Sequence, residues 1–162
     1  MDEKAKIDIN QVKPGMFWHE GNLFSFERLP DKKIKAVVEL VENGVIYGDL
    51  MASEMHNISD VEITWPDAKK FFKEFSYPCE KNEKIVWYNI DQFRRVYDYD
   101  NYHAVKKAFD KLQKVYRIGI YWSSSEYYTK TAWYWDFYNG KRGYQDKNLY
   151  LYIRPALGLE VE

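Results

Sequence analysis

Apolar and polar residues alternate in the first fifty positions in a way that predicts two β-hairpins. Two short apolar runs flank the segment Glu20–Asn22, whose composition is typical of a turn between strands. Alternation resumes over Ile34–Leu40 and is followed by Asn43-Gly44, a strong signal for a two-residue hairpin turn. The sequence therefore predicts a short N-terminal hairpin and a longer one after it.

The apolar period changes from two to about 3.6 near residue 64, which predicts a first helix. Thr64 offers a capping side chain, and Pro66 and Asp67 suit the electropositive first turn of a helix. We expect this helix to end near Tyr77-Pro78. Its apolar stripe has the spacing i, i+3, i+4, i+7 and consists of Ala68, Phe71, Phe72 and Phe75.

Two further helical segments are predicted in the middle of the chain. One starts at residues 89–91 and buries Phe93 and Val96, and the other starts at about Tyr102. The polar segment Asp98–Asn101 is expected to connect them. The apolar positions of the third helix are Val105, Ala108, Phe109 and Leu112.

A period of two returns from Ile118 onward, which predicts strands. Asn139-Gly140 is expected to form a turn, and the strand after it is expected to turn Leu149, Leu151 and Ile153 inward. Tyr150, Tyr152 and Arg154 then point to the opposite side. In the strand before the turn, Trp133, Trp135 and Phe137 share one face, and Ala132, Tyr134, Asp136 and Tyr138 share the other.

Together these patterns predict an α+β fold with N-terminal β-hairpins, two to three helices in the middle and a C-terminal antiparallel sheet. A chain of 162 residues falls within the size of one domain and can bury a core without disulfides or metal. We assign residues 1–12 to a charged leader and residues 13–162 to a single domain.

The aromatic content sets this chain apart from an average globular protein. It contains 15 Tyr, 9 Phe and 6 Trp, more rings than a core of this size needs. The polar hydroxyl of Tyr favours surfaces and interfaces. We therefore expect some of the rings to face a ligand or a partner.

Charge and hydropathy narrow the classes of partner. The 24 basic and 25 acidic residues nearly cancel, which argues against nucleic-acid binding. No stretch reaches the roughly 20 apolar residues of a membrane span, and residues 1–10 lack the apolar run of a signal peptide. The compartment stays open: it is cytoplasmic by default, and cell-surface or secreted if a leader was removed.

No residue pattern indicates catalysis or a cofactor. The run Ser123–Glu126 lacks the Gly-x-Ser-x-Gly turn of a serine hydrolase. Cys79 is the only cysteine and has no Cys or His at ligand spacing, so a buried hydrophobic role is expected for it. His19, His56 and His103 are scattered and form no metal pair.

The run Asp98–Asn101 is similar to the opening of a calcium loop, but its continuation departs from one. No Gly stands at the sixth position, and the twelfth is Phe109 where a bidentate Glu belongs. Capping of a helix by Asp98 or Asn101 is the alternative.

The residues around the C-terminal strands carry a family resemblance. The residues concerned are, in order, Tyr121-Trp122-Ser123-Ser124-Ser125-Glu126, Ala132-Trp133-Tyr134, Phe137, Asn139-Gly140 and Ile153-Arg154-Pro155. Their order and spacing resemble those of the bacterial DUF1566 or Lcl C-terminal-like domains over about residues 119–155. Trp65, Ala68 and Lys69 resemble the first helix of that family. Trp87-Tyr88-Asn89-Ile90-Asp91 stands where the family has a Trp, Leu, Pro, Thr segment, here without the Pro.

The resemblance implies a C-type lectin-like fold, related to fibrobacter paralogous domains and to the variable receptors of diversity-generating retroelements. It implies a binding module, because members with known roles look like adhesins or receptors. In the family the serine run looks structural, with hydroxyls that satisfy backbone groups. The usual cysteines of the family are absent here, as are the Glu-Pro-Asn and Gln-Pro-Asp triplets of calcium-dependent lectins.

We predict a ligand-binding surface on the Tyr-rich side of the C-terminal sheet, for a glycan or a protein ligand. Tyr side chains stack on ligands at a low entropic cost. The alternative is that these rings pair across strands or cover the helices. The predicted site residues are Tyr134, Asp136, Tyr138, Tyr150 and Tyr152 on the sheet, with Tyr127, Tyr128 and Tyr144 from nearby loops.

Two other functions compete with a binding module. As a structural or assembly subunit, the chain would use the aromatic face as an oligomer interface. An enzyme related to the formylglycine-generating enzymes would need paired cysteines and copper, which the single Cys79 cannot supply.

Overall fold

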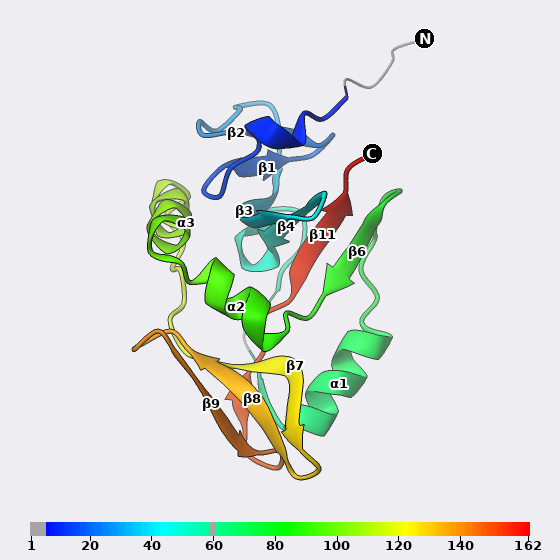
Figure 1. Ribbon diagram of the computed structural model, residues 1–162. Coiled ribbons are helices and arrows are strands. Elements are labelled where there is room, and N and C mark those ends of the chain that lie inside the picture. Colours follow the sequence, from blue (N-terminus) through cyan, green and yellow to red (C-terminus); the bar gives the residue numbers. More distant parts are fainter. Residues whose placement is uncertain (1–5, 59–60) are drawn as a thin grey trace.

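The computed structural model describes residues 6–58 and 61–162, which form two β-sheets and three α-helices (Figure 1). The predicted α+β class is confirmed. Sheet A has the strand order β2-β1-β3-β4-β11-β6 and sheet B the order β5-β10-β7-β8-β9. In the described ranges, no helix is long and apolar enough to cross a membrane.

Sheet A contains β1 (Phe17–His19), β2 (Leu23–Ser25), β3 (Ile34–Glu42), β4 (Val45–Asp49), β6 (Glu83–Val86) and β11 (Ala156–Glu160). Sheet B contains β5 (Glu62–Ile63), β7 (Ile120–Tyr128), β8 (Thr131–Asp136), β9 (Lys141–Asp146) and β10 (Leu151–Tyr152). The helices are α1 (Trp65–Glu74), α2 (Ile90–Val96) and α3 (Tyr99–Lys111), with short 3₁₀ turns at Ile9–Gln11 and Leu50–Ala52.

Both predicted N-terminal hairpins are present. β1 pairs antiparallel with β2, and β3 pairs antiparallel with β4. Asn43 and Gly44 connect β3 and β4 with positive φ angles of 51° and 76°, which two-residue hairpin turns of type I′ require. The turn chemistry in the sequence thus positions both hairpins.

Strand β3 is buried on both faces over most of its length. Helix α3 covers one face, where Val37 packs with Phe109. The other face holds Val38, and Ile7, Ile9 and Val12 of the N-terminal segment pack there. Lys35 is buried through an ion pair with Glu83, whose oxygen lies 2.7 Å from its ammonium nitrogen.

The first two helices begin where the sequence predicts. Thr64 caps α1, and Asn89 caps α2 in a reciprocal capping box with Gln92. The third begins three residues earlier than predicted, at Tyr99, because Asp98 caps it by accepting a hydrogen bond from Asp100 N. The segment Asp98–Asn101 is therefore the start of α3 rather than a connection.

The C-terminal third differs from the prediction in its strands. Asn139-Gly140 leads into β9, an edge strand that the sequence analysis missed, and β10 is short and pairs parallel with β7. Sheet B is therefore mixed. Leu149, predicted to be inward, is exposed, and Arg154, predicted to point away from the core, is buried. The chain then leaves sheet B, and β11 pairs with β4 and β6 of sheet A.

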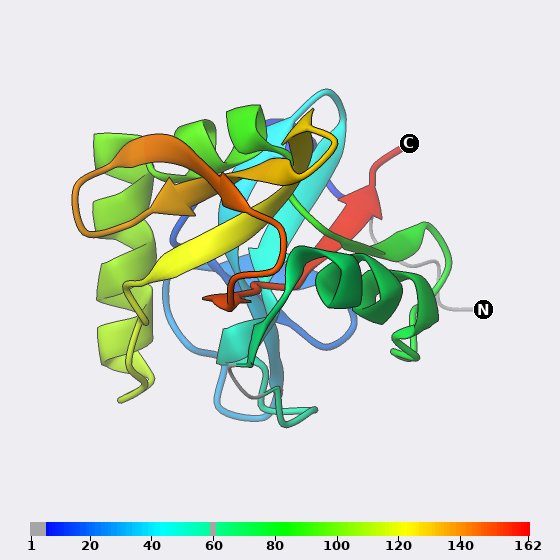
Figure 2. The ribbon, with the colours of Figure 1, turned by 90° about the horizontal axis from the view of Figure 1, so that it is seen from below.

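Helix α2 lies between the two sheets, and α1 packs on sheet B from another side (Figures 1 and 2). Phe93 of α2 packs with Trp135 and with Phe137, which follows β8. Trp65 and Ala68 of α1 pack with Ala132, on the opposite face of β8. Both faces of β8 are therefore partly covered, and we call the Trp135 side the α2 face of sheet B.

Candidate functional site

Four aromatic rings meet on the α2 face of sheet B, and we call Tyr127, Tyr128, Trp133 and Tyr144 the ring cluster. Tyr127 stacks on Tyr144 with ring centroids 4.3 Å apart and an interplanar angle of 19°. Trp133 meets the edges of both rings, at centroid distances of 4.8 Å and 5.7 Å. Tyr128 lies 4.9 Å from Tyr127. These geometries are the offset and edge-to-face arrangements that aromatic rings prefer.

Strand register and a bulge bring these rings together. Trp133 of β8 lies opposite Tyr144 of β9, so the two side chains share a face. The pairing of β7 with β8 shifts register between Trp122 and Glu126 and again between Glu126 and Tyr128. Tyr127 has the same parity along β7 as Tyr121, which packs with Trp135, so alternation already places Tyr127 on the α2 face. The second shift pairs Tyr128 with Thr131, which shares the face of Trp133, and so brings Tyr128 to the same side.

Serine hydroxyls and tryptophan indoles hold the bulge in β7. Ser123 Oγ donates to the carbonyl oxygen of Trp133 at 2.7 Å, and Ser125 Oγ accepts from Ile90 N at 3.0 Å. The indole nitrogens of Trp65 and Trp87 donate to the carbonyl oxygens of Ser123 and Trp122. The serine run therefore has a structural role, and the bulge is fastened to both α1 and α2.

The ring cluster is open to solvent. Tyr127, Tyr128 and Tyr144 are 41%, 70% and 53% exposed, and Trp133 is half-buried. Helix α2 covers the neighbouring Trp135 but leaves these rings accessible. The guanidinium carbon of Arg142 lies 4.9 Å from the Trp133 ring centroid, in cation–π contact. The cluster thus combines exposed ring surface with one cation.

Three of the eight predicted site residues belong to the ring cluster, and the other five lie elsewhere. Tyr134 is half-buried on the opposite face, where it packs with residues of α1 and crosses Gly143. Asp136 accepts a hydrogen bond from Tyr138 N, and Tyr138 is exposed in the turn after β8. Tyr150 is exposed before β10, and Tyr152 is half-buried beside Tyr121 with Arg117 over its ring.

Trp133 and Arg142 are site residues that sequence reasoning missed. Alternation grouped Trp133 correctly with Trp135, but it implied that the whole row is core. Arg142 lies in a strand with almost no apolar pattern. The Asn139-Gly140 turn could have indicated both residues. It places Arg142 opposite Trp135 and Tyr144 opposite Trp133, on one face of the sheet.

Cys79 is exposed, so the buried role expected for it is wrong. His19 is buried, with Nδ1 3.0 Å from Leu23 O and Nε2 accepting from Leu29 N. Burial lowers the pKa of His19 below its usual value, so it is neutral at pH 7. Within residues 6–58 and 61–162, no group of three or more His, Cys, Asp or Glu side chains could hold a metal ion.

A second group of polar residues lies buried between the sheets. Arg154 Nε donates to Asp49 Oδ2 at 2.8 Å, and the guanidinium contacts the rings of Tyr116, Tyr121 and Phe137. Although burial opposes its charge, Asp49 and nearby groups hold the pKa of Arg154 well above its ordinary value. This guanidinium joins sheet A to sheet B.

Glu39 is the second carboxyl of this buried group. Its Oε1 accepts from Tyr88 OH at 2.7 Å, and its Oε2 has no hydrogen-bond partner among the described residues. Burial and the charge of Asp49 raise the pKa of Glu39 to about 8, against the opposing effect of Arg154. One guanidinium cannot neutralise two buried carboxylates, so Glu39 carries a proton at neutral pH. The group is a core network closed to ligands.

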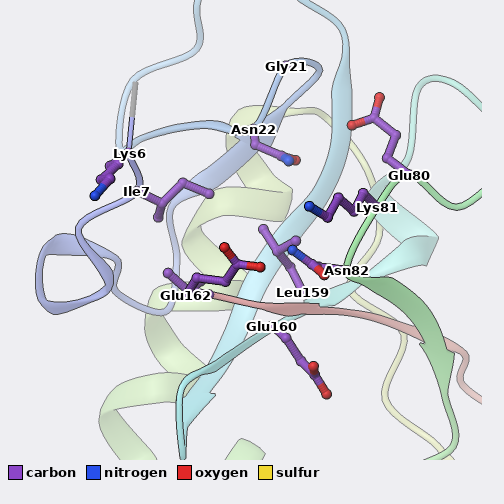
Figure 3. Close-up of a pocket in the computed structure, with 11 residues that line it drawn as sticks. Lys6, Ile7, Gly21, Asn22, Glu80, Lys81, Asn82, Leu159, Glu160 and Glu162 are labelled. Atoms are coloured by element: carbon purple, nitrogen blue, oxygen red, sulfur yellow. The ribbon is translucent and has the colours of Figure 1, made fainter. Parts of the chain in front are cut away.

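A groove of about 470 Å³ lies at the other end of the molecule, between the N-terminal segment, the β1–β2 turn and the end of the chain. In Figure 3, Lys6 and Ile7 face Glu80, Lys81 and Asn82 across the groove. Charges of both signs line its rim, and no aromatic ring lines it. It therefore lacks the stacking surface that the ring cluster presents.

Comparison with known proteins adds no relative. No family model matches the chain, and no curated protein matches it. The choice of site therefore rests on geometry and chemistry alone.

Proposed function

We propose that this chain is a non-enzymatic binding module that recognises a glycan through the ring cluster on sheet B. The observation that carries this proposal is the set of four adjoining, solvent-accessible rings beside Arg142. Tyr and Trp rings supply large, rigid contact surfaces at a low entropic cost, and flat ring faces suit the apolar faces of sugars. An exposed aromatic group of this kind is typical of recognition rather than of folding.

We also propose that the fold is C-type lectin-like, as the resemblance to DUF1566 domains implies. Residues that carry the resemblance have structural roles that support this proposal. Trp122 Nε1 donates to Ile63 O at 2.9 Å, and Ser123 bonds to the backbone of β8. Gly140 has a φ of 68°, and a side chain there would meet the ring of Tyr97.

A protein ligand is the second candidate, and the position of β9 favours it. β9 ends sheet B and pairs on one side with β8, so its other edge can add a strand of a partner. A second copy of this chain would then make the ring cluster an assembly interface. Lys141 and Arg142 in β9 are charges that discourage such pairing, which is why we place the glycan first.

Replacement of Tyr144 with Ala is expected to weaken binding about tenfold or more on a glycan array probed with the purified protein, because central aromatic residues dominate binding energy. The array is run with calcium and with a chelator, and the signals are expected to be equal. Tyr138→Ala is the matched control, since Tyr138 is 72% exposed but lies outside the ring cluster.

Thermal unfolding of both variants separates binding from folding. Unchanged binding by Tyr144→Ala, with an unchanged melting temperature, would remove the ring cluster from the proposed function. Binding of no glycan by the wild-type protein would leave the protein ligand as the function to test.

A further inference from the structure

We infer that the ring cluster takes an acidic saccharide, one that carries a uronic-acid carboxylate, and that Arg142 binds this carboxylate. The inference rests on the proposed function and names its ligand class. It depends on the position of Arg142, on the absence of an ion pair between Arg142 and any other described residue, and on the bonds that the nearby acidic residues make.

Arg142 is held in place beside the rings. It lies on β9 two residues before Tyr144, so both side chains project from the same face of the strand. Contact with the Trp133 ring, 4.9 Å from centroid to guanidinium carbon, limits the motion of the side chain. A guanidinium fixed by an aromatic ring loses less entropy when it binds an anion than a free one does.

The charge of Arg142 is not neutralised within the described chain. Arg142 is exposed and forms no ion pair with any residue in 6–58 or 61–162. By contrast, Arg28, Arg95 and Arg154 each pair with a carboxylate. Arg142 therefore keeps its donors available on the surface that the rings define.

Acidic side chains of the neighbouring strands and loops are engaged elsewhere. Glu126 accepts from Lys147 at 3.0 Å, and Asp136 accepts from the backbone nitrogen of Tyr138 at 2.8 Å. Asp146 accepts from Asn148 N at 2.8 Å. None of these carboxylates pairs with Arg142, so among the described residues its guanidinium stays available to an anionic ligand.

The two features together define the ligand. A sugar ring can stack on Tyr127 or Tyr144 while its carboxylate accepts two parallel hydrogen bonds from Arg142. A neutral sugar makes the first contact and lacks the second. A point-like anion such as inorganic phosphate makes the second and lacks the first, so neither should bind as tightly as a uronate saccharide.

Titration calorimetry with matched saccharides tests this inference. The probes are oligogalacturonate and its fully methyl-esterified form, which has the same backbone without the charge, with alginate and hyaluronan oligomers as further uronates. We expect at least one uronate probe to bind, oligogalacturonate to bind about tenfold tighter than its ester, and added salt to weaken the difference. Inorganic phosphate alone is expected not to bind measurably.

Variants separate this inference from the proposed function. Arg142→Gln should abolish the preference for the acid over the ester, whereas Arg94→Gln, at an exposed arginine of α2 outside the site, should leave both affinities unchanged. Any of three results would overturn the inference: equal affinity for the acid and the ester, a preference for the acid that survives Arg142→Gln, or no binding of any uronate probe. Binding that survives Tyr144→Ala would overturn the proposed function instead.

Discussion

Replacement of Arg154 with Met is expected to lower the free energy of unfolding by about 3–5 kcal/mol, the cost of leaving a buried charge without its partner. Met retains much of the apolar volume among Tyr116, Tyr121 and Phe137, so lost packing contributes little. Asp49 is fully buried and would lose the charge-assisted bond of 2.8 Å. Urea denaturation at pH 7 measures the effect.

Arg94→Met serves as the control for this prediction. Arg94 is exposed on α2, and its replacement should change the free energy of unfolding by about 0.5 kcal/mol or less. The double variant Arg154→Met, Asp49→Asn should regain part of the loss, because the second change removes the unpaired charge. A loss below about 1 kcal/mol for Arg154→Met would contradict a structural role for the buried ion pair.

The wild-type protein is expected to lose stability as the pH rises towards 8, because Glu39 must then give up its proton. Replacement of Glu39 with Gln is expected to remove this loss. The pKa of Glu39 is raised to about 8 in the folded state from a usual value of 4.5. Between these values the folded state holds more protons than the unfolded state, so stability is full below about pH 4.5 and falls up to about pH 8. The slope for one proton is about 1.4 kcal/mol per pH unit.

Urea denaturation at pH 6.5 and at pH 8.0 tests the prediction for Glu39. His19 has a lowered pKa and contributes in the opposite sense, with stability lost as the pH falls through its unfolded value of 6.5, so its effect within this window is small. The wild-type protein should lose up to about 2 kcal/mol across the window. Glu39→Gln should lose much less, whereas Glu74→Gln, at an exposed position, should behave like the wild type. Parallel curves for wild type and Glu39→Gln would mean that the buried carboxyl is ionised at pH 6.5.

Local signals were sufficient to predict most of the fold. The Asn43-Gly44 turn, the Thr64 cap and the apolar stripe of α1 each act within a few residues, and the structure contains all three elements. The start of α3 was missed because its first turn is exposed, so the apolar stripe begins one turn later. Capping of a helix by Asp98, one of the two alternatives for this run, is confirmed.

Features that depend on distant partners could not be predicted from local patterns. β11 is buried through pairing with β4 and β6, which lie more than sixty residues earlier in the chain. Its sequence Ala156–Glu160 shows no alternation, because both faces are covered. Arg154 appeared to be a surface residue because its partner, Asp49, lies in the first sheet.

The candidate site was predicted only in part, again because distant contacts decide which side chains are exposed. Alternation assigned Tyr134 and Tyr152 to an open face. In the structure both are half-buried, because Tyr134 packs against residues of α1 and Tyr152 packs against Tyr121. The last register shift in β7 pairs Tyr128 with Thr131, on the face of Trp133, because such a bulge reverses the parity on which alternation depends. Sequence thus indicated that Tyr residues of this sheet are accessible, and the register determined which ones gather.

The most direct test of ring-cluster binding is an NMR titration of the ¹⁵N-labelled protein with the glycan that gives the strongest array signal. We predict that amide shifts change in residues 126–128, 132–134 and 142–145, around the ring cluster, and stay constant near Gly21 and Leu159 in the opposite groove. Shifts that concentrate in that groove or on α3, with residues 142–145 unchanged, would contradict binding at the ring cluster.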